Sequence, residues 1–247
     1  MPDPITVVKI GGNDLETPGF VPQLSAAVAA LVQRTPLVIV HGGGKSVSRL
    51  QQQLGLEPVY VDGQRVTDAP SLDVVEMVLS GLMNKRLTLA LLQHDVDALG
   101  MSGVDRGLLR VEPVPQMGLV GHIVAVRAEV LRDLCAQGVV PVVSPVSLGP
   151  DGRYNVNADH AAGAIAAALD AETATFLTNV PGVQVDSAVA PALTSAETHA
   201  LIERGVITGG MIPKVTAALD VVAQGVRRAV ITDLAGLTAG SGTVFTT

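Results

Sequence analysis

Two lysines in this sequence stand beside pairs of glycines. Lys9 lies inside the apolar run 5–10 and is followed by Gly11 and Gly12, while Lys214 follows the glycine pair at 209–210. A buried ammonium group needs a partner or an anionic ligand, and glycine turns let backbone N–H groups approach such a ligand closely. These residue types together could hold a phosphate group. Each lysine alone also fits a plainer interpretation, in which its ammonium group simply reaches water.

Three consecutive glycines mark the segment 41–46, His-Gly-Gly-Gly-Lys-Ser. A Walker A loop would need a glycine at Ile39, and a dinucleotide-binding fingerprint would need one at Val47, so neither motif matches here. Glycines between a strand and a helix nevertheless expose N–H groups at the helix N-terminus, which attracts anions. Because each glycine costs conformational entropy, a plain turn rarely contains three in a row. An anion site is therefore favoured over a simple turn.

Arg65 lies in a polar segment, 63–68, just before a long helical pattern. A guanidinium group in a loop can hold a carboxylate through two parallel hydrogen bonds. The same segment also fits a helix cap formed by Thr67 or Asp68 beside a solvated arginine. The sequence alone leaves these two interpretations equal.

Asn155, Asn157 and Asp159 stand at alternate positions ahead of an alanine-rich helical pattern. In an extended segment, the three side chains point the same way. A carboxylate there can orient an ammonium group and keep it charged. Alternatively, either Asn157 or Asp159 serves only as the helix N-cap.

Short apolar runs that end in turn residues predict the strands that position these side chains. They cover residues 5–10, 37–40, 139–143, 173–177 and 228–231. Amphipathic spacing predicts helices over residues 21–34, 46–54, 72–93, 128–136, 159–169, 195–204 and 212–223. This alternation indicates a mostly parallel sheet with helices on both faces and a ligand site beyond the carboxyl ends of the strands. Residues 107–126 break the alternation and suggest a hairpin at a sheet edge.

The composition excludes several classes of protein. The chain has 247 residues and a formal net charge of −7, which argues against a broad nucleic-acid-binding surface. Its apolar runs are far shorter than the ~20 residues of a membrane helix, and no signal peptide is readable. The single cysteine, Cys135, excludes an internal disulfide, and the five histidines show no metal-ligand spacing. We expect a cytoplasmic protein without nucleic-acid or membrane partners and without a protein-bound metal.

Taken in order, these motifs resemble those of the amino acid kinase family. The resemblance covers nearly the whole chain and is carried by residues 9–12, 40–44, 63–68, 75–81 with 84–85, 99–105, 155–159, 178–182 and 209–214. It implies an open three-layer αβα sandwich with a mostly parallel, eight-stranded sheet. It also implies a single kinase domain over residues 1–247, with an acceptor-binding lobe at about 1–170 and a nucleotide-binding lobe at about 171–247.

Within the family, the segments look most like those of members that phosphorylate N-acetyl-L-glutamate. The reaction implied is transfer of the γ-phosphoryl group of ATP to the side-chain carboxylate, the second step of arginine biosynthesis, with Mg²⁺ held mainly by phosphates and water. By resemblance, Lys9 and Lys214 flank the transferring phosphoryl group, and Asp159 holds both ammonium groups. Backbone N–H groups of Gly12 and Gly44 stabilise the equatorial oxygens of the phosphoryl group. The acceptor carboxylate is already a nucleophile and needs no general base.

The resemblance also implies how each substrate binds. Arg65 holds the α-carboxylate of the acceptor and Asn155 bonds its acetamido group, while Gly43 and Gly44 line the site. The residues implied to contact the nucleotide are Asn179, Val180, Pro181, Gly182, Val183, Gln184, Val206, Ile207 and Thr208. The scarcity of aromatic residues fits a nucleotide site built from backbone and aliphatic contacts.

Lys9 stands close to the start of the sequence, where arginine-inhibited members of the family carry an additional helix that joins dimers into hexamers. We therefore expect a homodimer that is insensitive to arginine. The helix at 72–93 has more apolar residues than one stripe, which fits a dimer interface and burial in the core equally well.

Two alternative functions stay open at this point. The chain could phosphorylate aminoadipate or glutamate linked to a carrier protein, or it could be a catalytically silent nucleotide or metabolite sensor. The net charge of −7 and the sequence at 155–159 favour a free amino acid as acceptor. The presence of Lys9, Lys214 and Asp159 favours catalysis over a sensor.

Overall fold

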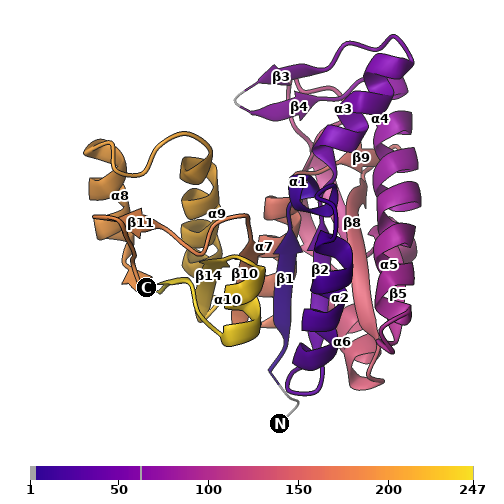
Figure 1. The fold of residues 1–247 in the computed structure, drawn as a ribbon. Coiled ribbons are helices and arrows are strands. Elements are labelled where there is room, and N and C mark those ends of the chain that lie inside the picture. Colours follow the sequence, from indigo (N-terminus) through magenta and orange to yellow (C-terminus); the bar gives the residue numbers. More distant parts are fainter. Residues whose placement is uncertain (1–3, 62, 247) are drawn as a thin grey trace.

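The computed structural model describes residues 4–61 and 63–246, apart from the side chain of Asn13. Its strands are β1 Thr6–Ile10, β2 Leu37–His41, β3 Val59–Val61, β4 Gln64–Val66, β5 Ala98–Gly103, β6 Leu109–Pro113, β7 Gly121–Val126, β8 Val140–Leu148, β9 Arg153–Asn155, β10 Thr173–Leu177, β11 Gln184–Val185, β12 Ala188–Val189, β13 Ala192–Leu193, β14 Arg228–Thr232 and β15 Thr243–Phe245. Eleven of these strands form one sheet in the order β13-β15-β14-β10-β1-β2-β8-β6-β7, with β5 and β9 also paired to β8. Figure 1 shows β1 and β10 near the middle of this sheet.

Most pairs in the main sheet are parallel, as predicted. β1 pairs in parallel with β2 and β10, while antiparallel pairs join β6 to β7, β8 to β9 and β14 to β15. The sheet has more strands than the eight expected, because short segments such as β9 and β13 hydrogen-bond to longer neighbours. The hairpin expected within residues 107–126 is confirmed as β6 and β7.

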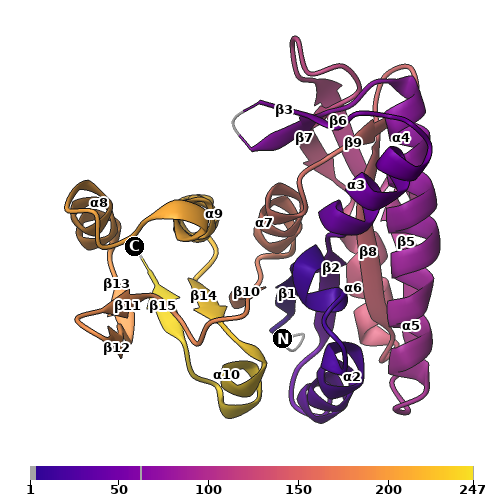
Figure 2. The same ribbon diagram turned by 45° about the horizontal axis from the view of Figure 1, so that its top comes forward.

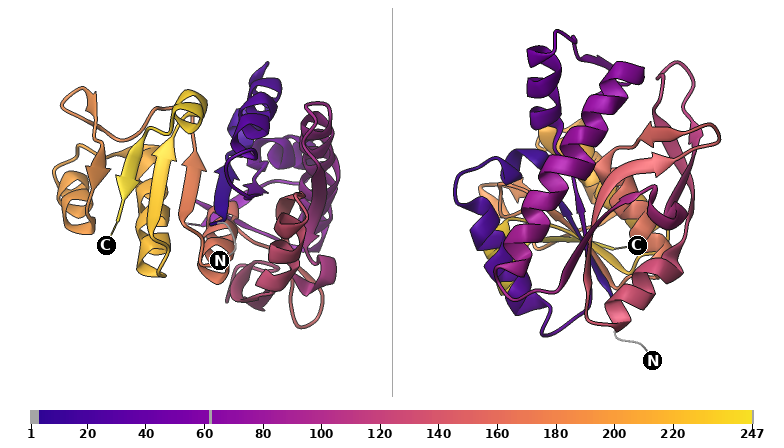
Figure 3. Two further views of the ribbon diagram at one scale, coloured as in Figure 1. Left: turned by 90° about the horizontal axis from the view of Figure 1, so that it is seen from below. Right: turned by 90° about the vertical axis from the view of Figure 1, so that its right-hand side faces the viewer.

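Helices cover both faces of the sheet, which confirms the three-layer αβα sandwich (Figure 3). They are α1 Gly12–Leu15, α2 Phe20–Leu31, α3 Gly44–Gln53, α4 Ala69–Glu76, α5 Asn84–Leu92, α6 Ala128–Ala136, α7 Ala158–Leu169, α8 Ser195–Glu203, α9 Ile212–Ala223 and α10 Leu234–Ala239, with a π-helix η1 at Met77–Met83 and 3₁₀ turns η2 Asp105–Gly107 and η3 Gly209–Met211. One buried core joins the sheet to α6, α7, α8 and α9. A second core joins its other face to α2, α4, η1, α5 and α10.

Alternate residues of β1 face the two sides of the sheet. Val8 and Ile10 are buried in the core that contains α2 and α5, whereas Val7 is buried in the core that contains α7 and α9. Lys9 shares the side of Val7 because side chains alternate along a strand. It therefore points toward α7, where Asp159 stands in the first turn.

One helical rod runs from Ala69 to Leu92, as the spacing at 72–93 predicts, but its middle is the π-helix η1. Asn84, the first residue after η1, is fully buried. Its Nδ2 donates to the carbonyl oxygen of Val142 at 2.8 Å and lies 3.3 Å from that of Met101. A widened turn changes the phase of the helix that follows it, and here it directs an amide group into the sheet.

Several strands lie outside the predicted runs, among them β3, β4, β5, β9, β13 and β15. β5 contains two glycines, which weaken strand propensity, and its pairing with β8 holds it in place. Residues 63–68, predicted as a loop, contribute β4, which pairs with β3. Figure 2 shows this hairpin extending beside α3 and α4. Within the part of the chain that the structure describes, no helix is both long and apolar enough to cross a membrane.

Candidate active site

Lys9 and Asp159 form an ion pair at the carboxyl end of β1. Lys9 Nζ lies 2.9 Å from Asp159 Oδ1, and the two side chains are 13% and 26% exposed. Asn157 is the N-cap of α7, because its side chain accepts a hydrogen bond from the backbone N–H of Asp159 at 2.7 Å. The cap is therefore supplied by Asn157, and the carboxylate of Asp159 remains available to hold the ammonium group.

Backbone packs directly against backbone where the turns after β1 and β2 meet. A Cβ atom placed on Gly12 would lie 2.5 Å from the Cα and N atoms of Gly43 and 2.9 Å from the N atom of Gly44. The N–H of Gly42 also donates to the carbonyl oxygen of Ile10 at 3.0 Å. Only glycine permits an approach this close. We call Gly12, Gly43 and Gly44 the glycine cradle.

The glycine cradle lies at the N-terminus of α3. This helix begins at Gly44, and its N-cap, Gly43, has no side chain to satisfy the first turn. The first N–H groups of a helix lack intrahelical partners, and the helix dipole gives them partial positive charge. With the ammonium group of Lys9 on the adjacent strand, these donors are suited to phosphoryl oxygens.

Strands β2 and β8 stop pairing beyond Val40 and Val143. The buried polar residues His41 and Asn84 lie where the two strands separate. His41 Nε2 lies 3.1 Å from Asn84 Nδ2, and His41 Nδ1 lies 3.1 Å from the carbonyl oxygen of Gly42. The partners assign Nδ1–H as the donor and Nε2 as the acceptor from the Asn84 amide. Burial lowers the pKa of His41 to about 4, so its ring is neutral at pH 7. The pair fixes the backbone that leads into the glycine cradle.

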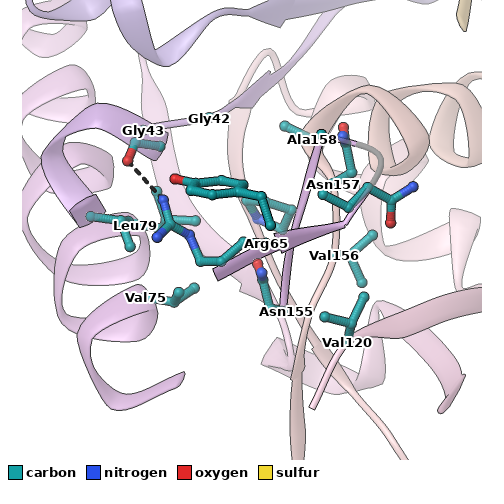
Figure 4. A pocket seen from close by; sticks show the side chains of 16 residues that line it. Gly42, Gly43, Arg65, Val75, Leu79, Val120, Asn155, Val156, Asn157 and Ala158 are labelled. Atoms are coloured by element: carbon teal, nitrogen blue, oxygen red, sulfur yellow. Dashed lines mark hydrogen bonds between the residues drawn. The ribbon is translucent and has the colours of Figure 1, made fainter. Parts of the chain in front are cut away.

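A cavity of about 220 Å³ lies between the glycine cradle and the β3–β4 hairpin (Figure 4). Gly43, Gly44, Arg65 and Asn155 line it, so the structure brings the four predicted acceptor-binding residues together. The other walls are largely apolar and include Val47, Val75, Leu79, Val120 and Val156. Asn155 Nδ2 donates to Thr67 Oγ1 at 3.1 Å, which orients the amide group. The cavity therefore combines polar groups for a small, charged ligand with apolar walls.

The guanidinium group of Arg65 is held by neutral acceptors. Its Nη2 donates to the carbonyl oxygen of Gly44 (3.1 Å) and to Ser48 Oγ (2.8 Å), while Nη1 donates to Gln51 Oε1. The Tyr60 ring centroid lies 4.9 Å from Arg65 Cζ. Burial lowers the pKa of Arg65, but a guanidinium group stays charged at neutral pH. No carboxylate pairs with it in residues 4–61 and 63–246, so its charge is available to an anionic ligand.

Lys214 lies in the first turn of α9, apart from the ion pair of Lys9 and Asp159. Its Nζ donates to the carbonyl oxygen of Gly210 at 3.0 Å. Among the described residues, Asp159 forms an ion pair with Lys9 and none with Lys214. Of the two ammonium contacts expected for Asp159, the structure therefore contains one.

Asp14 is a residue of this region that the sequence analysis missed. It lies in α1, and its Oδ2 would be 2.6 Å from a Cβ atom placed on Gly11. Burial raises the pKa of its carboxyl group, and the positive charges of Lys9, Lys214 and Lys45 oppose that increase. All three ammonium groups thus act on one carboxyl group at the end of β1. A lone aspartate after a glycine turn carries no signal that would have found it.

The residues expected to contact the nucleotide lie in two segments, after β10 and after α8. Among them, Asn179, Pro181, Gln184, Val206 and Thr208 are exposed. Val183 and Ile207 are only 1% and 2% exposed and pack in the core with α7 and α9. The N–H of Val183 also donates to Thr243 Oγ1 at 2.8 Å. Val183 and Ile207 therefore stabilise the fold of this region, and the exposed members are the ones whose side chains a ligand can reach.

The chain is similar to known proteins over most of its length. The sequence profile of the Amino acid kinase family matches residues 4–233. An acetylglutamate kinase of Roseiflexus sp. (strain RS-1) is 53% identical, covering 98% of this chain and 94% of its own length. Another, of Methanopyrus kandleri, is 44% identical, covering 96% of this chain and 98% of its own length. The crystal structure of smu.665 from Streptococcus mutans UA159 has a TM-score of 0.83 at 29% identity, covering 98% of each chain.

Proposed function

The chain belongs to the amino acid kinase family, and from this premise we propose that it transfers the γ-phosphoryl group of ATP to the side-chain carboxylate of N-acetyl-L-glutamate, a step of arginine biosynthesis. The two relatives described above are both named acetylglutamate kinase, and the similarity covers 94% and 98% of their lengths. The observation that carries the proposal is the shared position of Gly43 and Gly44. They belong to the glycine cradle beside Lys9, and they also line the cavity that contains Arg65 and Asn155.

The acceptor is bound so that its two carboxylates meet different groups. Arg65 holds the α-carboxylate, Asn155 bonds the acetamido group, and the side-chain carboxylate lies toward the glycine cradle. That carboxylate is ionised at neutral pH, because a glutamate side chain has a pKa of about 4.3. It therefore attacks the γ-phosphorus without a general base. As the new P–O bond forms, the bond to the bridging oxygen breaks, and ADP leaves with the electron pair.

Catalysis consists mainly of offsetting the charge of two approaching anions. Lys9, oriented by Asp159, supplies one positive charge, and the N–H groups of Gly12 and Gly44 donate to the equatorial oxygens of the phosphoryl group. Lys214 supplies the second charge from the other side once its ammonium group leaves the carbonyl oxygen of Gly210. The positive charges of both lysines oppose the rise in the pKa of Asp14, as expected if both act near the end of β1.

We assign ATP to the lobe formed by residues 171–247, and the acceptor to residues 1–170. The exposed side chains of Asn179, Gln184 and Thr208 are available to the nucleotide, and the cradle donors suit its phosphates. Mg²⁺ supplies further neutralisation of phosphate charge when bound. A hard, octahedral ion of this kind is held mainly by phosphates and water. Across the described residues, no group of three or more His, Cys, Asp or Glu could hold a metal ion.

The helical rod also supports the expected homodimer. Met77, Leu82, Leu89 and Leu92 are 60%, 41%, 56% and 49% exposed along it, and Figure 3 shows the rod on the outside of the sheet. Such a concentration of exposed apolar side chains is typical of an interface. Light scattering should give the mass of a dimer, and Leu89→Glu should give that of a monomer.

The proposed location is the cytoplasm. The thiol of Cys135, the single cysteine, is buried, and burial raises its pKa to about 11, so it is unreactive. A chain without disulfides fits a reducing compartment.

The proposed reaction can be tested with hydroxylamine, which converts acyl phosphates to hydroxamates that form coloured complexes with Fe³⁺. Purified protein with ATP, Mg²⁺ and N-acetyl-L-glutamate should form hydroxamate, whereas omission of either substrate should abolish it. A signal only with glutamate or aminoadipate linked to a carrier protein would replace the proposed acceptor. Nucleotide binding without hydroxamate from any acceptor would indicate a sensor.

A further inference from the structure

Gln51 is a fully buried amide in α3 whose two ends are both engaged. Its Oε1 accepts a hydrogen bond from Arg65 Nη1, and its Nε2 donates to Ser71 Oγ at 2.8 Å. Ser71 is itself anchored, because its backbone N–H donates to the N-cap residue Asp68 at 2.9 Å. A buried amide that lost either partner would leave a polar group unsatisfied, so the orientation of Gln51 is strongly determined. Arg65 is therefore connected to the start of α4 through Gln51.

The other contacts of Arg65 also come from α3 or from the hairpin above it. Gly44 and Ser48 accept two hydrogen bonds from Nη2, and the hydroxyl group of Ser48 lies 2.9 Å from that of Tyr60. A guanidinium group has five N–H donors. Three of them donate to residues of α3, and Arg65 lines the cavity shown in Figure 4, where a ligand can reach its remaining donors.

The chemical nature of these acceptors is as important as their geometry. An amide oxygen, a hydroxyl group and a backbone carbonyl orient the guanidinium group without cancelling its charge. A carboxylate in the position of the amide would form a charge-assisted bond and compete with an anionic ligand. Neutral acceptors thus give a cation that is fixed in direction and still fully charged.

We propose that Gln51 is a positioning residue that aims Arg65 at the α-carboxylate of the acceptor and keeps its charge uncompensated. This inference rests on the proposed function and adds a determinant of acceptor affinity that does not touch the substrate. It predicts that changes at Gln51 act on the acceptor KM and leave kcat and the ATP KM nearly unchanged.

The test compares Gln51→Glu with Gln52→Glu, which makes the same charge change at the exposed neighbouring position of α3. Gln51→Glu should raise the acceptor KM about tenfold or more, with kcat within about twofold of the wild type. Gln52→Glu should resemble the wild type. Gln51→Met removes the acceptor oxygen without adding charge and should raise the acceptor KM by a smaller factor, about two- to fivefold.

Thermal unfolding of each variant identifies those that fold, and Gln51→Met provides the comparison if Gln51→Glu does not. A wild-type acceptor KM in the folded Gln51 variants would overturn the inference. Equal losses in kcat and in affinity for ATP would also overturn it, because they indicate a general structural role. Failure of the proposed function is distinct, since the wild type itself would then form no hydroxamate from N-acetyl-L-glutamate.

Discussion

Gly12→Ala should lower kcat about 100-fold without unfolding the protein. The added Cβ atom would lie 2.5 Å from two backbone atoms of Gly43, whereas ordinary contact begins at 3.4 Å. Neither neighbour can rotate away, because both atoms are backbone, so the two turns must separate by about 1 Å. A displacement of this size at catalytic groups can cost about 10²-fold in rate. Gly12 itself lies in helical backbone, where alanine is otherwise tolerated.

Gly11→Ala is the matched control for this substitution. Its Cβ atom would meet the flexible Asp14 carboxylate at 2.6 Å, and Gly11 has an extended φ of −67° that alanine adopts readily. Hydroxamate formation at saturating substrates gives kcat for both variants, and thermal unfolding verifies their folding. A folded Gly12→Ala protein with kcat within about threefold of the wild type would refute the reasoning. Equal losses in both variants would refute it as well, since the spacing of the cradle would then not be the cause.

Three further predictions concern single side chains. Lys9→Ala and Lys214→Ala should each lower kcat about 100-fold or more with smaller changes in either KM; steady-state kinetics with unchanged kcat would remove that lysine from its role. Arg65→Ala should raise the acceptor KM about tenfold or more at nearly constant kcat, and an unaltered KM would place the α-carboxylate elsewhere. The pKa of His41 is 6.5 in the unfolded chain and about 4 in the folded one. The neutral, buried ring therefore contributes fully to the free energy of unfolding above pH 6.5, and this contribution is lost as pH falls through 4. Denaturant unfolding of the wild type and His41→Gln should therefore give stabilities that converge between these pH values, and a constant difference would contradict a buried neutral ring.

The elements with strong local patterns could be predicted from the sequence. The runs at 173–177 and 212–223 match β10 and α9 to the residue, because an apolar run or an amphipathic repeat between turn residues determines each. β5 and the β3–β4 hairpin could not be predicted, since β5 is stabilised by distant β8 and β4 forms only through contact with β3. Pairing partners of this kind are not encoded within a short window of sequence.

The residues of the candidate site also fall into those that could be predicted from the sequence and those that could not. Lys9 and Asp159 are predictable because a charged residue in an apolar strand requires a partner. The supporting contacts of Gln51, Asn84 and His41 could not be predicted, because a polar side chain looks like surface until the fold buries it. Their importance comes from the places where strands diverge and helices meet, which exist only in three dimensions.

The number of residues in the π-helix η1 determines how α5 is rotated relative to α4. Successive residues of an α-helix are rotated by about 100°, so deletion of one residue from Met77–Met83 would turn α5 by about that angle relative to α4. Asn84 would leave its place beside His41, and the exposed face of α5 would rotate with it. The residue count of η1 therefore sets the angular registration between the glycine cradle and the outer surface of the rod. Insertions and deletions are constrained at this segment even where substitutions are tolerated.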